Sequence, residues 1–139
     1  MAKSKYLSRK LLDHALGVQP YAVPAQVYLA LFTSSAGLAE GSLANELAGA
    51  GYSRPAVHMA PAQDAATGAQ SVGAQNIEFA PATADWPQMQ AWAIMDADTG
   101  GNVLHHGALP QYGDPPAYKR VFTGDIYFIR AADIVISEE

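Results

Sequence analysis

Between residues 96 and 102, turn-forming residues stand at every second position, and three of the four carry side-chain oxygens. Asp96, Asp98, Gly100 and Asn102 repeat the spacing of the first half of an EF-hand loop, which binds calcium through oxygen ligands. The twelfth position of such a loop needs a bidentate glutamate, but here it is Gly107. Because Asp and Asn favour turns through their own side chains, we interpret the stretch as a hairpin turn without a metal or cofactor.

Three histidines are the second candidate set for metal binding. His105 and His106 are adjacent, so on a strand they face opposite sides of a sheet and cannot both bind one ion. We expect one of them to be half-buried with a hydrogen bond and the other to be exposed. His58 would have to approach from a different strand, which spacing alone does not indicate. No metal ligand is therefore assigned.

The sequence has no motif for nucleophilic, metal-dependent or phosphate-binding catalysis. G-x-S-x-G, H-E-x-x-H and G-x-x-x-x-G-K-[ST] do not occur. Glu138 and Glu139 form a carboxylate pair at a chain end that we expect to be frayed, where burial cannot tune a pKa. We therefore predict that the protein is not an enzyme. Trp86 is most simply a core aromatic, although beside Pro87 in a connection it can also line a contact patch.

The element around which the chain is arranged is a predicted β-hairpin over residues 89–109. Its arms, 90–96 and 103–109, are nearly continuous apolar runs, which is typical of strands near the centre of a two-layer β core. Residues 96–102 supply the turn, including glycines that tolerate positive φ. A further strong strand, also central, is predicted at 27–33.

A helix is predicted over residues 4–16, with Ser4 as its cap and Gly17 as its stop. Basic residues gather at its N-terminal end, where the helix dipole disfavours cations. These residues, which we call the basic arm, are Lys3, Lys5, Arg9 and Lys10. Two interpretations stay open: a solvated face of a helix docked on the sheet, or an attachment surface for an acidic neighbour.

Seven to eight short antiparallel strands after one N-terminal helix predict a mainly β protein with a single β-sandwich or jelly-roll-like domain over residues 1–139. The sandwich spans about residues 26–137, and the remaining strands are expected at 52–59, 72–79, 118–122, 126–130 and 134–137. Pro55 places its strand at an edge or a bulge. Residues 110–116 are too rich in proline for regular structure, so we expect a protruding loop that presents Tyr112 for contacts.

Composition narrows the possible partners. Half of the 139 residues are hydrophobic and only 15% are charged, so part of the surface is expected to be covered by neighbours. The net charge of −5, from 8 Lys and Arg against 13 Asp and Glu, argues against nucleic-acid binding. The absence of cysteine excludes disulfides. No apolar run reaches the roughly 18 residues that a membrane span needs.

Short motifs spread over nearly the whole chain carry a family resemblance. They are KLLDH at 10–14, VYLALFT at 27–33, GAGYSR at 49–54, IEF at 77–79, ATADW at 82–86, AIMDADTGGNVL at 93–104, GAL at 107–109 and GD at 124–125. In this order they resemble a family of short proteins of tailed bacteriophages and prophages that are often labelled tail fibre proteins. The chain departs from that pattern at Pro55 and in the proline-rich loop at 110–118.

The resemblance implies a non-enzymatic structural protein of a phage virion, with no catalytic residues to carry over. Such a building block of the tail, neck or capsid surface would assemble in the cytoplasm of the host bacterium, form a homo-oligomer and dock on other virion proteins. The alternative is a host-surface receptor-binding module of the tail. A 139-residue chain lacks the long repetitive shaft of a fibre, so a compact knob, collar or cement piece is expected.

Overall fold

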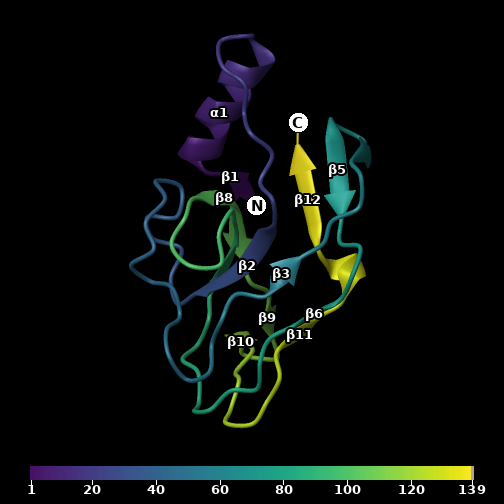
Figure 1. Ribbon diagram of the computed structural model, residues 1–139. Coiled ribbons are helices and arrows are strands. Elements are labelled where there is room, and N and C mark those ends of the chain that lie inside the picture. Colours follow the sequence, from purple (N-terminus) through teal and green to yellow (C-terminus); the bar gives the residue numbers. More distant parts are fainter. Residues whose placement is uncertain (139) are drawn as a thin grey trace.

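A computed structural model describes residues 1–138 (Figure 1). Within these residues there are twelve short strands, one α-helix and one 3-10 turn. They are β1 (Ala2–Lys3), α1 (Lys5–Ala15), β2 (Val27–Phe32), β3 (Ala56–Val57), β4 (Gln63–Asp64), β5 (Ala69–Val72), β6 (Ile77–Glu78), β7 (Ala91–Met95), β8 (Val103–Ala108), β9 (Gln111–Tyr112), β10 (Ala117–Tyr118), β11 (Phe128–Ile129), η1 (Ala131–Asp133) and β12 (Val135–Glu138). The predicted mainly β fold with one N-terminal helix is confirmed, although its strands are shorter and more numerous than expected.

The largest sheet is antiparallel and has the order β1-β8-β7-β2-β3. Strands β7 and β8 form the predicted hairpin, and β2 pairs with the whole of β7, from Tyr28 opposite Met95 to Phe32 opposite Ala91. The hairpin and strand 27–33 therefore lie at the centre of the sheet, as their apolar sequences predicted. Pro55 immediately precedes β3, which is an edge strand, where a missing N–H leaves no partner unpaired.

The two faces of this sheet belong to two different apolar clusters, because successive side chains of a strand face opposite sides. Leu29, Leu31 and Ile94 contribute to the larger cluster, which continues into β6, β11, β12 and their connections. Phe32 and Met95 contribute to the smaller cluster. The larger cluster thus lies between the main sheet and the smaller C-terminal sheets, which is the two-layer arrangement of a sandwich.

The connection at 34–51 has a structural role that its sequence did not reveal. Its length and its Gly, Ala and Ser content are typical of a functional or mobile loop. In the structure Leu38 is buried in the smaller cluster, and Leu43 packs against it. Phe32 also forms a bridge with Glu46. The connection therefore covers the face of the main sheet opposite the C-terminal layer.

The strands outside the main sheet form small sheets with the orders β12-β5-β4, β11-β6 and β10-β9. Two of the predicted strands, 118–122 and 126–130, are shorter than expected, at Ala117–Tyr118 and Phe128–Ile129. In the turn between them Asp125 accepts a hydrogen bond from the backbone N–H of Phe122. The loop at 110–116 was predicted to be irregular, and this was wrong in part. Strands β9 and β10 form a hairpin there, since the prolines at 115 and 116 fall in its turn and leave the ladder intact.

Helix α1 confirms the predicted helix to within a residue at each end. Ser4 caps it by accepting the N–H of Leu7 at 3.1 Å, and its hydroxyl also donates to the carbonyl of Val103 on β8. Leu7 is the buried residue of the helix. The helix extends away from the main sheet, and the segment that follows runs back along it to β2 (Figure 1).

Two neighbouring glycines in the hairpin turn allow a matched test of turn geometry. Gly100 and Gly101 both have positive φ, +62° and +75°, but a Cβ on Gly101 would lie 2.6 Å from the Asp96 carboxylate, whereas a Cβ on Gly100 meets nothing within 4 Å. Gly101→Val should destabilise the fold by about 1–3 kcal/mol or more, through backbone strain together with this clash. Gly100→Val carries the strain alone. Urea unfolding should therefore rank Gly101→Val as the less stable variant, and equal stabilities would contradict the role of Asp96.

Candidate functional site

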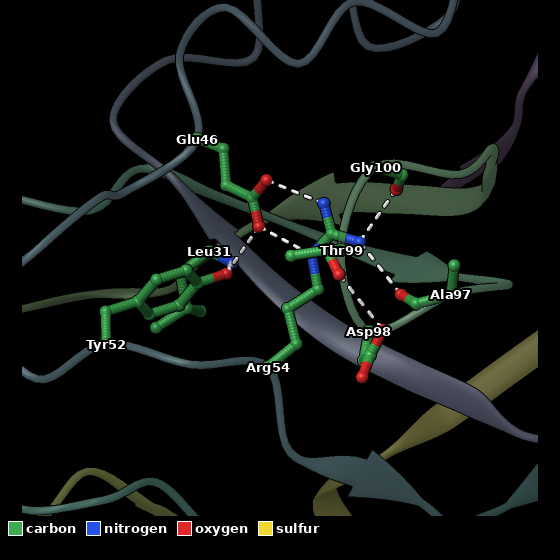
Figure 2. A network of polar contacts seen from close by, with 8 residues as sticks. All are labelled: Leu31, Glu46, Tyr52, Arg54, Ala97, Asp98, Thr99 and Gly100. Atoms are coloured by element: carbon green, nitrogen blue, oxygen red, sulfur yellow. Dashed lines mark hydrogen bonds and ion pairs between the residues drawn. The ribbon is translucent and has the colours of Figure 1, made fainter.

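The most extensive polar network in the interior is centred on Arg54, just before β3 (Figure 2). Its guanidinium forms a bidentate pair with Glu46, with Nε–Oε2 and Nη2–Oε1 distances of 2.6 Å each. Nη1 donates to the carbonyls of Ala97 and Gly100, both at 2.8 Å. Only 3% of the Arg54 side chain is exposed. One side chain therefore joins the 34–51 connection to the turn of the β7–β8 hairpin.

Few hydrogen-bonding groups of this network are free to bind or activate another molecule. Four of the five N–H groups of a guanidinium are used here. The Tyr52 hydroxyl donates to Glu46 Oε2 at 2.7 Å and accepts the N–H of Leu31 at 3.2 Å. The hydrogen bonds to Glu46 raise the pKa of Arg54, and burial followed by the bond to Glu46 raises the pKa of Tyr52. The charged arginine and the neutral tyrosine are therefore both stabilised, which suits a structural clamp rather than an acid or base.

The Asp96–Asn102 stretch is a turn, as predicted. Asp96 accepts hydrogen bonds from the backbone N–H and the side-chain amide of Asn102, at 2.7 and 3.0 Å. Its carboxylate oxygens thus close the turn from within. Within residues 1–138 there is no group of three or more His, Asp or Glu side chains arranged to hold a metal ion.

His105 and His106 face opposite sides of the main sheet, as the strand prediction required, because they pair with Ile94 and Ala93 respectively. His105 lies 3.4 Å from Glu138. The prediction that the second histidine is exposed was wrong. His106 is half-buried, and its Nε2 is buried without a hydrogen-bond partner among the described residues. Burial lowers the pKa of both histidines, more than the nearby Glu138 and Glu40 raise it.

Glu138 and Glu139 were expected at a frayed end. Glu139 lies outside the described residues, and for Glu138 the structure corrects the expectation. Glu138 belongs to β12, opposite Ala69, and accepts a 2.8 Å bond from Lys3 on β1. Burial raises the pKa of Glu138, but the bonds from Lys3 and His105 outweigh it and lower the pKa below its usual value. The last strand and the first strand are thus tied together across the molecule.

The basic arm is largely engaged within the chain. Lys3 pairs with Glu138, and Lys5 lies 3.0 Å from Glu40. The ammonium group of Lys10 lies 5.8 Å from the centre of the Tyr6 ring. For Arg9, no hydrogen bond or ion pair of the side chain occurs within residues 1–138. These internal pairs reduce the positive charge offered to a neighbour, and the proposed attachment role of the arm stays a prediction.

The two aromatic residues assigned to contacts have opposite positions. Trp86 is only 2% exposed, and its indole N–H donates to the carbonyl of Ala50 at 2.9 Å. The suggestion that it lines a contact patch was therefore wrong, because neighbouring aromatic rings, including Phe79, enclose it. Tyr112 is 59% exposed, on β9. It stays available for a partner.

An apolar groove, which the sequence gave no sign of, runs between the main sheet and the C-terminal strands. Its volume is about 370 Å³. Trp92 and Ile94 of β7 form one side, Phe128 and Ile136 the other, and Tyr112 lies at the β9–β10 hairpin. The groove depends on strands far apart in the chain, so no local motif could have revealed it. Within residues 1–138, no helix is long and apolar enough to cross a membrane.

The interior polar groups around Arg54 are paired with one another, and apolar side chains are exposed on the surface, an arrangement typical of proteins that act through contacts. Comparison with known proteins specifies the class further. The chain belongs to the family described as Podophage GP4 fiber I protein gp80, whose model matches residues 2–137. The predicted resemblance to phage fibre proteins is confirmed, and the chain is a structural component of a phage virion. Proteins of such families are generally non-enzymatic. No curated protein matches the chain.

Replacing Glu46 tests whether the Arg54 clamp holds the fold together. Glu46→Gln keeps the shape of the side chain but leaves a buried guanidinium without a counter-charge, so it should cost about 3–5 kcal/mol in the free energy of unfolding. Glu40→Gln makes the same chemical change in the exposed pair with Lys5 and should change stability little. Urea unfolding midpoints measure both. A similar loss in the two variants would show that the clamp is not a major contributor.

Proposed function

We propose that this chain is a compact, non-enzymatic fibre component that self-associates and docks on other virion proteins. The observation that carries the proposal is the projection formed by α1 and residues 15–25. Leu12 and Leu16 on the helix are 60% and 74% exposed, and Val18 and Val23 beyond it are 72% and 89% exposed. Four exposed apolar side chains on one projection, in a protein with a well-packed core, favour a contact site there.

The family supports the same proposal from an independent direction. A phage fibre protein must be held in a particle by its neighbours, so it needs surfaces that the isolated chain leaves uncovered. The interior offers no competing function, because the polar side chains around Arg54 already bond one another. The α1 projection therefore has the composition and position of a surface for subunit contacts.

A charge-matched pair of triple variants tests whether the projection acts in assembly. Lys5→Gln/Arg9→Gln/Lys10→Gln should lower the amount of the chain in purified particles, and raised salt should loosen the wild-type attachment, because ions screen charges over about 8–10 Å. The control is Lys119→Gln/Arg120→Gln/Arg130→Gln, which removes as many cations from the stretch between β10 and η1 and should assemble normally. Quantitative immunoblots of particles measure both.

Two results would contradict the proposed role of the α1 projection. If the α1 variant reaches wild-type occupancy, attachment lies instead with the connection at 34–51 or the hairpin region at 110–118. If the wild-type chain itself is missing from purified particles, the proposed function is wrong. Immunogold labelling of tagged chains would also show whether the protein is carried on the tail, the neck or the capsid.

A second candidate function, a host-surface receptor-binding module, is favoured by the apolar groove. Aromatic rings of Trp92, Tyr112 and Phe128 line it, and such rings are enriched where proteins bind partners. If the groove binds a receptor, the purified protein should compete with particles for adsorption to host cells. Tyr112→Ala should weaken this competition, whereas Tyr118→Ala, on the partner strand but outside the groove, should not. Unimpeded adsorption at saturating protein would exclude this function.

A further inference from the structure

The charges of α1 run against the dipole of the helix. The first turn contains no acidic residue. Lys5 lies in the first turn, where the dipole is positive, Arg9 and Lys10 lie in the second turn, and Asp13 lies in the last turn, where the dipole is negative. Glu40 offsets the charge of Lys5. For Arg9 and Asp13, no ion pair with another side chain is found within residues 1–138, so their unfavourable placement is not explained by the monomer.

These charges share one face of the helix with exposed leucines. Spacings of four, three and four residues place Lys5, Arg9, Leu12 and Leu16 in one stripe, opposite the buried Leu7. Asp13 lies beside this stripe, four residues after Arg9. The segment that follows, ALGVQPYAVPA at 15–25, has no charged residue, and its residues 20–24 lie along an adjoining flank of the helix, against Tyr6 and Lys10. The stripe itself therefore combines a cation, an anion and two exposed leucines.

We propose that a second copy of this chain covers this surface, with the two α1 helices packed antiparallel about a two-fold axis. The proposal rests on the proposed function, because it names the partner used in self-association. In this arrangement Arg9 lies opposite the partner's Asp13, and Asp13 opposite the partner's Arg9. Each basic N-terminal half also faces the negative end of the other helix dipole. The charges that are misplaced in one helix are complementary in the pair.

Other arrangements of the two helices would place these charges unfavourably. A parallel pair, or a three-fold bundle of parallel helices, would put Arg9 next to its own copies, and like charges in contact are unfavourable. A wholly acidic neighbour would match Arg9 but would oppose Asp13. With Arg9 opposite the partner's Asp13, the two-fold axis passes level with residue 11, so Leu12 is covered by its own copy and Leu16 by the aliphatic part of the partner's Lys5. The presence of both signs within one apolar patch thus selects a self-complementary, two-fold contact.

Charge exchange in solution tests the arrangement. The wild-type protein should be a dimer by sedimentation equilibrium at micromolar concentrations. Arg9→Asp and Asp13→Arg should each weaken dimerisation by about tenfold or more, because each places two like charges in contact twice. Both changes improve the match of α1 with its own dipole, so loss of the helix cannot account for the effect. Circular dichroism of each variant checks that the helix is kept.

Mixing the two variants separates contacts between chains from contacts within a chain. An equimolar mixture of Arg9→Asp and Asp13→Arg should form a heterodimer, because every facing pair is again of opposite sign. The double variant should recover the homodimer. Leu16→Ser should also weaken the dimer, whereas Ile126→Ser, at a residue that is 51% exposed in the connection at the opposite end, should leave it intact.

Three results would overturn the interface. These are a wild-type monomer at every concentration, a trimer, or single charge variants that dimerise like the wild type. A monomer would also remove self-association from the proposed function, but docking on virion proteins is read out separately, by the presence of the chain in particles. Conversely, a dimer with the expected charge dependence, found for a chain that is absent from particles, would support the interface and reject the virion role.

Discussion

The paired strands β2 and β7 are apolar on both faces, and the rest of the structure must bury both of them. Leu29, Leu31 and Ile94 need a cover on one side, and Phe32 and Met95 need another on the opposite side. The C-terminal sheets supply the first cover and the connection at 34–51 supplies the second. Removal of this apolar area from water is the dominant favourable contribution to folding. Burial of this apolar area explains why the long irregular connection at 34–51 is well packed.

The second cover has no regular structure of its own, so it needs specific attachment. Arg54 provides this by joining Glu46 of the connection to the carbonyls of the hairpin turn. A buried ion pair adds little net stability, but it favours one arrangement of the segments that meet at it. The bond between Lys3 and Glu138 acts similarly at the edge, where it ties the first strand to the last. Polar side chains in the interior thus fix the positions of segments that apolar packing alone would leave adjustable.

The surfaces that can bind partners are those that these interactions leave exposed to solvent. The buried polar groups are mostly paired with one another, whereas apolar side chains are exposed on α1, on the segment after it and along the C-terminal groove. That division is expected for a member of a phage fibre family, since a virion component is completed by its neighbours. The proposed two-fold contact gives the charges of α1 the same explanation, because charges that are unfavourable in the isolated helix would face opposite charges on the second copy.

The sequence by itself determined the elements whose signals are local. The cap at Ser4, the glycine turn after Asp96 and the continuous apolar runs of β2 and β7 predicted the helix, the hairpin and the central strands, because these depend on residues close together in the chain. Only the tertiary structure decided that Arg54 pairs with Glu46, that Trp86 is enclosed and that a groove opens beside Trp92. These features join segments that are distant in sequence, or depend on how layers pack, and neither spacing nor periodicity records such contacts.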